Sequence, residues 1–403
     1  MAKIDPLFYG LNKVMAVIAV TIIITAASFL GGYLYGLGSQ APARQVTTIT
    51  VSSASTITIY ETKTYIATKT PSLEELISNA RKEGKLTILG MIPAEQIRGV
   101  IDLFKSKYPF IDVTYLRLPP GEFGARIQTE LRSGKVTFDL LIPSGPSPQL
   151  IFLLDNKVLQ PYISSTTQGL PKELIAGNYE AFAIVGATVI TALVYNKNAL
   201  SLDKVPKSFK ELVESPYKDL WKGRLGWVDP RVGGSVWMGF FKLYQLYDVD
   251  WFKKLSDLKP GIETTNVAVE SKTVTGEYIL GWVFDYMAAP DIAKGAPVNI
   301  VYPDDLNILT LYWVGITRDA DHPNAAKLFI EFLATKEAQK AIVEKGYLWS
   351  RLYKDLKPLP QYPNIWELKN LVIIPLDEYR NVVLKEFTDQ GALGKIVKAM
   401  GLG

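Results

Sequence analysis

The sequence predicts an α/β fold built on a mainly parallel, doubly wound sheet. Between residues 72 and 142, segments with helical periodicity alternate with short apolar segments, which is typical of such a sheet. The chain has 403 residues, of which 48% are hydrophobic and 21% charged. At about 150 residues per domain, this length allows two or three lobes with a substantial core.

The individual elements can be placed from their end signals. Ser72, Glu75 and Gly84 predict a helix over SLEELISNARKEG, because Ser72 and Glu75 form a capping box and Gly84 ends the helix. The segments that follow are predicted as strands over Lys85–Leu89, Ile111–Leu116 and Phe138–Ile142, and as helices over Ala94–Tyr108 and Glu122–Ser133. In such sheets, ligands bind beyond the carboxyl ends of the strands.

The composition excludes several chemistries. The chain contains no Cys, which rules out disulfides, thiolate metal sites, a cysteine nucleophile and a thioether-linked lipid. Its one histidine, His322, excludes a two-histidine metal motif, and Pro323 beside it predicts a structural place at a helix entry. A formal net charge of +4 over this length gives no sign of nucleic-acid binding. We expect no cofactor and no nucleic-acid partner.

The N-terminal region predicts a membrane anchor. The run Val14–Leu37 has no charged residue, and as a helix it would extend about 36 Å, longer than a hydrocarbon core of roughly 30 Å. Lys3 and Lys13 precede the run, whereas the first basic residue after it is Arg44. This asymmetry favours a cytoplasmic N-terminus over residues 1–13 and a cell-surface location for the rest of the chain.

Alternatives for this region remain open. Ala41-Pro42-Ala43 has the small-x-small pattern of a signal-peptide cleavage site, although signal apolar regions are usually about 7–15 residues long. Tyr9-Gly10-Leu11 resembles the pilin-type signals of some archaeal surface binding proteins, but lacks the basic residue that usually precedes the Gly. Residues 38–71 are rich in Ser and Thr and predict an extended stalk, with a strand at Thr48–Val51 as the alternative.

Several phrases in the rest of the chain carry a family resemblance. They include ARKEGKLTI, LFKSKYPFIDVTYL, GEFGARIQTELRSGKVTFDLLIPS, PKSFKELVESPYKDLWKGRLGWVDPRVGGS, GEYILGWVFDYMAA and DHPNAAKLFIEFLATKEAQKAI, in this order. Residues 72–350 thereby resemble the class II extracellular solute-binding proteins of ABC importers, in the branch that includes ferric-iron and phosphonate binders. The last fifty residues match this family only loosely.

The resemblance implies a two-lobed periplasmic-binding-protein-like fold with a hinge and an interlobe cleft. Within a solute-binding domain over 72–403, the first lobe would comprise about 72–183 and 305–350, and the second about 190–297, with C-terminal helices in 351–403. It also implies a small-molecule solute, with ABC permease and ATPase subunits as partners. Such a protein closes over its ligand without a catalytic side chain.

Candidate ligand-binding residues lie in loops that follow predicted strands or open predicted helices. Gly and Ser in these loops permit close backbone approach and hydrogen bonding, and helix N-termini favour anions. Arg231 could clamp a carboxylate or phosphoryl group with two hydrogen bonds. The candidates are Pro93, Gly121, Ser144, Gly145, Arg231, Gly233, Gly234, Ser235, Asp285 and Tyr286.

Each candidate also has a plainer structural explanation. The Pro143–Ser147 segment could be an ordinary turn in which Ser caps a helix, and Arg231 could be a solvated surface charge beside a turn capped by Asp229. Tyr286, at the predicted end of a strand, could be a core aromatic instead of a cleft residue. The sequence alone leaves these alternatives open.

The favoured function is a receptor that captures an oxyanion, such as a phosphonate, phosphate ester, sulfate or carboxylate. The alternative within the family is a ferric ion held by Tyr286, with Asp285 or Glu122, although relatives of that kind often carry adjacent tyrosines and a histidine that this chain lacks. A surface sensor and a hydrolytic enzyme remain as other classes. The loops contain no general base beside a nucleophile, so we expect no enzyme.

Overall fold

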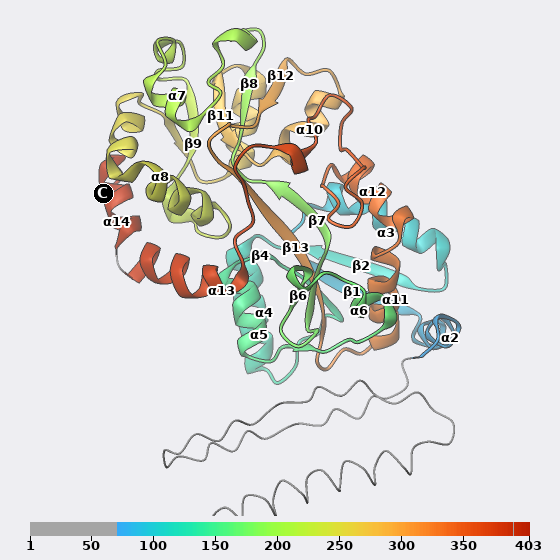
Figure 1. The fold of residues 1–403 in the computed structure, drawn as a ribbon. Coiled ribbons are helices and arrows are strands. Elements are labelled where there is room, and N and C mark those ends of the chain that lie inside the picture. The colour runs from blue at the N-terminus through green and yellow to red at the C-terminus, as the bar shows by residue number, and fades with distance from the viewer. Residues whose placement is uncertain (1–70, 390) are drawn as a thin grey trace, which may run out of the picture. The chain divides into compact units, whose positions relative to one another are not determined.

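The computed structural model describes residues 71–389 and 391–403. The predicted anchor, both processing signals and the stalk up to Thr70 lie outside these residues. Within the described part, no helix combines the length and apolarity that crossing a membrane requires. Residues 71–403 group into one unit by their contacts, and two β-sheets organise it (Figure 1).

The first sheet, with the helices around it, forms what we call the first lobe. Its main strand order is β2-β1-β3-β13-β7-β6, and short strands β4, β5 and β14 pair with β13. β1 is parallel to both β2 and β3. The strands are β1 Lys85–Gly90, β2 Asp112–Arg117, β3 Leu140–Ile142, β4 Ser144–Gly145, β5 Leu159–Gln160, β6 Ile175–Ala176, β7 Ala181–Val189, β13 Asn307–Thr317 and β14 Leu371–Val372.

The second sheet, with its helices, forms the second lobe. Its strand order is β10-β9-β11-β8-β12, in which β9 is parallel to β10 and β11, and β8 is antiparallel to β11 and β12. The strands are β8 Ala192–Asn196, β9 Leu225–Val228, β10 Gly261–Glu263, β11 Leu280–Val283 and β12 Val298–Val301. The two-lobed α/β architecture expected from the sequence is therefore confirmed.

Two strands of the first lobe connect directly to strands of the second. β7 leads through residues 190–191 into β8, and β12 returns through residues 302–306 into β13. β7 and β13 are antiparallel neighbours, with Leu309 opposite Val189. The prediction of a mainly parallel sheet is thus right for β1, β2 and β3 but wrong for these crossing strands, because a chain that leaves a lobe and returns beside itself must run in opposite directions.

Helices surround both sheets, and the predicted starts of α2 and α3 are confirmed, whereas α4 begins at Pro120, two residues before the predicted Glu122. α2 has the capping box of Ser72 and Glu75, and Gly84 follows it with φ 65°. The helices of the first lobe are α2 Leu73–Glu83, α3 Ala94–Lys107, α4 Pro120–Arg132, α5 Pro148–Asp155, α6 Ser165–Gln168, α11 Pro323–Leu333 and α12 Lys336–Gly346. Those of the second are α7 Phe209–Glu214, α8 Val236–Asp257, α9 Asn266–Thr275 and α10 Asp285–Ala293.

The C-terminal segment contacts both lobes (Figure 1). After β14 it forms α13 Leu376–Glu378, two π-helical turns over 379–389, and α14 Ala392–Ala399. Arg380 pairs with Asp155 of α5 in the first lobe, and Glu378 pairs with Lys242 of α8 in the second. The segment therefore bridges the two lobes.

Candidate functional site

The ends of strands from both lobes face each other. In the first lobe, Gly90 lies opposite both Arg117 and Ile142, so the carboxyl ends of β1, β2 and β3 share one edge. In the second lobe, Val283 at the end of β11 lies opposite Ala192, which directly follows the crossing from the first lobe. Both carboxyl edges therefore adjoin the hinge, the position at which such sheets bind ligands.

The three loops of the first lobe's edge contain four of the predicted residues. Pro93 precedes α3, and Gly121 lies in the first turn of α4, where a Cβ would meet no atom within 4 Å. Ser144 is buried against the sulfur of Met91. Gly145 is tightly packed, since a Cβ there would lie 2.8 Å from Leu150. Pro93 and Gly121 are thus accessible to a solute, whereas Ser144 and Gly145 are buried and pack beneath the surface of this edge.

The loop after β9 contributes the predicted glycines and Arg231. Gly233 and Gly234 have φ of 76° and 69°, a conformation that favours glycine. A Cβ on Gly234 would lie 3.8 Å from Cγ of Pro120, so the rims of the two lobes approach each other here. Ser235 precedes α8 and is buried, but its side chain does not cap the helix.

Arg231 is engaged within its own chain. Its Nε and Nη2 donate to Asp229 at distances of 2.9 and 2.6 Å, and Nη1 donates to the carbonyl of Leu402 at 3.0 Å. Hydrogen bonding and the adjacent guanidinium lower the pKa of Asp229 below its ordinary value, which keeps it ionised. The predicted anion clamp is therefore occupied by a carboxylate and by the C-terminus.

Asp285 and Tyr286 begin α10 instead of ending a strand, since β11 stops at Val283. Both side chains are buried. The carboxylate of Asp285 accepts hydrogen bonds from four groups and is fully inaccessible. It thus has no free oxygen with which to contact a solute in this arrangement.

A cluster of phenols and one guanidinium lies where the lobes meet. The hydroxyl groups of Tyr286 on α10 and Tyr312 on β13 interact. Tyr312 also lies close enough to Tyr115 on β2 to help raise the pKa of Tyr115. Burial raises the pKa of Tyr312 to about 12 and that of Tyr286 well above its ordinary value. The nearby positive charge of Arg117 opposes this rise in all three tyrosines.

We call Tyr115, Arg117, Tyr286 and Tyr312 the tyrosine–arginine cluster. Arg117 is exposed at the end of β2, so its guanidinium is available to a solute. The hydroxyl of Tyr115 already donates to the carbonyl of Ile92 at 2.6 Å, and the hydroxyls of Tyr286 and Tyr312 bond to each other. Sequence reasoning identified only Tyr286. The signal for Tyr115 and Arg117 was present: residues two apart on a strand share a face, and both lie at the carboxyl end of a predicted strand.

The alternative metal ligands are not brought together. Glu122 is exposed on the first turn of α4, and Asp285 is enclosed by its donors. Among the described residues, no group of three or more His, Asp or Glu side chains could hold a metal ion. Any metal at this edge would therefore depend on the phenols of the tyrosine–arginine cluster.

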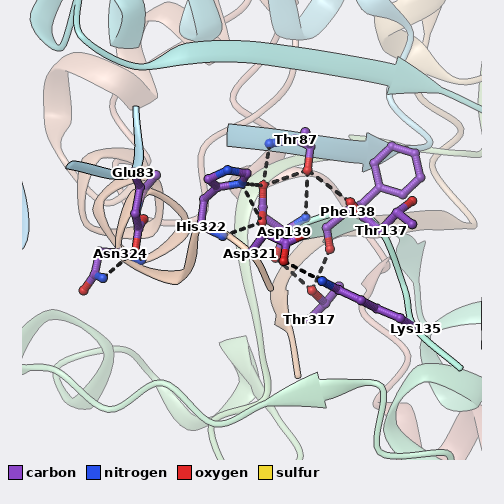
Figure 2. A network of polar contacts seen from close by, with 11 residues as sticks. Glu83, Thr87, Lys135, Thr137, Phe138, Asp139, Thr317, Asp321, His322 and Asn324 are labelled. Carbon is purple, nitrogen blue, oxygen red and sulfur yellow. Dashed lines mark hydrogen bonds and ion pairs between the residues drawn. The ribbon is translucent and has the colours of Figure 1, made fainter. Parts of the chain in front are cut away.

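His322 occupies the structural position that the sequence predicted (Figure 2). It precedes α11, and its Nδ1 lies 3.0 Å from Oδ2 of Asp139. The buried carboxylate of Asp139 also accepts from the backbone and hydroxyl of Thr87 at 2.8 and 2.7 Å. Asp139 precedes β3, so this network lies at the sheet edge opposite the tyrosine–arginine cluster.

One surface hollow of about 370 Å³ lies elsewhere, between α8 and the C-terminal segment. Tyr244, Asp248, Glu386 and Lys395 line it, and all four side chains remain at least partly exposed to solvent. Its walls come from the second lobe and the C-terminal segment alone. The interlobe edge is the stronger candidate, because groups from both lobes converge there.

Comparison with known families gives a match over most of the described chain. The family described as bacterial extracellular solute-binding protein matches residues 99–362. Among curated proteins, an aconitate isomerase from a Pseudomonas species is 32% identical over 88 residues, which is 22% of this chain and 29% of that protein.

Solved structures of similar fold cover most of this chain. The substrate-binding protein of an ABC transporter from Agrobacterium tumefaciens is 18% identical, with TM-score 0.68, and covers 78% of this chain and 94% of its own. AfuA from Actinobacillus pleuropneumoniae, with fructose-6-phosphate bound, is 20% identical, with TM-score 0.64 and coverage of 79% and 99%. Iron-bound HitA from Pseudomonas aeruginosa is 21% identical, with TM-score 0.60 and coverage of 79% and 97%.

Proposed function

Because the chain belongs to the bacterial extracellular solute-binding proteins, we propose that it is the substrate-binding component of an ABC importer. It captures a small solute between its lobes and delivers it to the permease, whose ATPase subunits power transport. Closure of the lobes around the hinge strands β7 and β13 buries the solute, and no catalytic side chain is needed.

We propose an oxyanion as the solute, and the tyrosine–arginine cluster carries this proposal. An exposed guanidinium at the carboxyl end of a strand can make two parallel hydrogen bonds to a phosphoryl, sulfate or carboxylate group. The raised pKa values of Tyr286 and Tyr312 keep both phenols protonated near neutral pH. Since their mutual hydrogen bond uses one hydroxyl hydrogen, the other is left to donate to a solute. The N-termini of α3 and α4 open onto the same edge and favour negative charge.

The predicted loop residues fit around this centre in our proposal. Pro93 and Gly121 let a solute approach the two helix N-termini, and Gly233 and Gly234 close the opposite rim. Ser144, Gly145 and Ser235 shape the edge from buried positions. We assign Arg231 to anchoring the C-terminus, and Arg117 takes the role of anion partner.

The test is a binding screen of the full-length chain against inorganic phosphate, sulfate, citrate, fructose-6-phosphate and neutral sugars. A bound solute raises the unfolding midpoint by mass action. Arg117→Ala should abolish the shift given by the best anion. Arg132→Ala is the matched control, since Arg132 is an exposed arginine at the C-terminal end of α4, and the N-terminal end of α4 is the one at the proposed site. If only neutral sugars shift the midpoint, the anion proposal fails.

The second candidate solute is a ferric ion with a synergistic anion. The observation that favours it is the meeting of three phenols, because phenolate oxygen is a hard donor that suits Fe(III). Their raised pKa values oppose deprotonation, so the metal would have to displace protons. Titration with ferric citrate distinguishes the two: a visible phenolate-to-iron absorption band that Tyr286→Phe removes would favour iron over a simple anion.

We also propose that the protein acts at the cell surface, held by an N-terminal transmembrane helix over Val14–Leu37 with residues 38–71 as a stalk. The length and apolarity of that run support this proposal. An archaeal pilin-type signal or a cleaved signal peptide are the alternatives. N-terminal sequencing of the membrane-extracted protein distinguishes them, because either kind of processing exposes a new N-terminus beyond Gly10.

Members of this family are binding proteins for transport and not enzymes as a rule, and we propose that this chain follows them. The similarity to an aconitate isomerase covers 22% of the chain. Incubation with cis- and trans-aconitate tests this alternative directly: interconversion of the two acids would contradict the transport role, whereas binding without turnover agrees with it.

A further inference from the structure

Asp285 is buried at the junction of both crossing strands, with an exposed fraction of zero. Its Oδ1 accepts from the hydroxyl of Thr188 at 2.5 Å and from the amide of Val189 at 3.1 Å. Its Oδ2 accepts from the indole of Trp349 at 2.6 Å and from the hydroxyl of Tyr302 at 3.1 Å. Burying a carboxylate is unfavourable unless donors of this kind surround it.

These donors come from separate segments of the chain. Thr188 and Val189 end β7, the outgoing crossing strand, and Tyr302 lies on the return between β12 and β13. Trp349 follows α12 of the first lobe and exchanges two backbone hydrogen bonds of 2.8 Å with Ala187. One carboxyl group of the second lobe thus joins both crossings and a segment of the first lobe.

Asp285 also opens α10, and the next residue is Tyr286 of the tyrosine–arginine cluster. The position of the Tyr286 phenol against Tyr312 therefore depends on where the first turn of α10 is held. A shift of that turn would separate the phenols without touching either of them.

We propose that Asp285 is a positioning residue that locks the first turn of α10, and with it Tyr286, to both crossing strands when the lobes close. The inference deepens the solute-binding function proposed above and rests on it. Asp285 does not contact the solute, and it acts through Tyr286 and through the hinge.

The titratable groups that face Asp285 belong to several elements. They are the phenols of Tyr302 and Tyr362, with Tyr286 and Tyr312 beyond them. Burial raises the pKa of each phenol, so these groups stay neutral between pH 4 and 8, whereas burial raises the pKa of Asp285 to about 6. Separation of the lobes that admits water to the Asp285 carboxyl should therefore depend on pH. Because the buried carboxyl holds a proton more tightly than a solvated one, this separation becomes less favourable as the pH falls through about 6.

The test measures the separation of the lobes in the full-length chain. Because the protein contains no Cys, spin labels on Ala125→Cys of α4 and Lys210→Cys of α7, both exposed, report one distance between the lobes. In the chain that carries only the two labels, the distribution of label-to-label distances should narrow as the pH falls from 7.5 to 5. It should also shift toward the shorter distances expected of closed lobes. Asp285→Ala should broaden the distribution at every pH, and Asp285→Asn should remove the pH-dependent step.

Two variants, Trp349→Phe and Tyr302→Phe, distinguish positioning of α10 by Asp285 from a general contribution of Asp285 to the stability of the protein. Each removes one donor to the ionised carboxyl, so the step should move to higher pH while the fold remains. A pH profile that is the same in all variants and in the unchanged chain would overturn the proposal, and circular dichroism identifies a variant that has not folded.

Binding of sulfate, whose charge is constant over this pH range, tests the proposed function separately. Asp285→Ala should weaken sulfate binding at least tenfold. If the unchanged chain binds no sulfate or other oxyanion, the anion proposal fails and the distance measurement still decides the role of Asp285. If sulfate binds equally well to the unchanged chain and to Asp285→Ala, the positioning role fails and the anion proposal stands.

Discussion

The indole of Trp349 donates a hydrogen bond of 2.6 Å to Oδ2 of Asp285 and so connects the end of α12 to the start of α10. We expect Trp349→Phe to destabilise the protein, because a hydrogen bond to a buried charged group contributes about 1.5–3 kcal/mol. The loss should be larger at pH 7.5 than at pH 5, where Asp285 is protonated. Urea unfolding at the two pH values measures it, and equal losses at both would contradict the assignment.

Asp285→Asn should change how stability depends on pH. A carboxyl whose pKa is raised by burial contributes stability that is fully present below its ordinary pKa and is lost as the pH rises through about 6. Raising the pKa of Asp285 from its ordinary value to about 6 corresponds to at most about 3 kcal/mol of unfolding free energy. The free energy of unfolding of the unchanged chain, relative to Asp285→Asn, should therefore fall between pH 4.5 and 7.5. A rise would contradict the direction of the shift.

Arg231→Ala should loosen the C-terminus and leave solute binding unchanged. The substitution removes the hydrogen bond to the carbonyl of Leu402 and the guanidinium that pairs with Asp229, which keeps only the backbone amide of residue 231 as a donor. We expect faster hydrogen exchange in α14 and a solute affinity within about twofold of the original, since exposed ion pairs contribute little. A tenfold loss of affinity with no change in exchange would instead restore Arg231 as the anion clamp.

The network around Asp139 predicts a purely structural effect. Asp139→Ala leaves the His322 ring and the Thr87 donors without their buried acceptor, and a buried donor left without a partner typically costs about 1–3 kcal/mol. Solute affinity measured well below the new unfolding midpoint should not change, because the network lies at the opposite edge of the sheet. A change in affinity would show that the Asp139 network affects solute binding and would contradict a purely structural role.

The sequence predicted the local elements of this fold well. The capping box of Ser72 and Glu75 and the place of His322 at a helix entry depend on neighbours within a few residues, and both are present in the structure. The start of α10 was misplaced, because the apolar run of β11 continues through Phe284 and Asp285 was assigned to the end of the strand instead of the first turn of a helix. Periodicity cannot locate a boundary inside such a run.

The interlobe centre was only partly predictable. Its location at the carboxyl ends of the strands follows from the alternation of elements, and three of the expected loops do share one edge. The partners of each side chain depend on long-range geometry that spacing does not encode. Arg231 and Asp229 are two residues apart yet pair with each other, and Tyr312 reaches the cluster from a strand that returns far along the chain.

We expect an anion to bind between the lobes beside Arg117. The most direct measurement is the equilibrium affinity of the full-length chain for the oxyanion that shifts its unfolding midpoint most, compared with Arg117→Ala and the matched control Arg132→Ala. The unchanged chain and Arg132→Ala should bind the anion equally well, and Arg117→Ala should bind it at least tenfold more weakly. Equal affinity in all three proteins, or no affinity for any oxyanion, would contradict it.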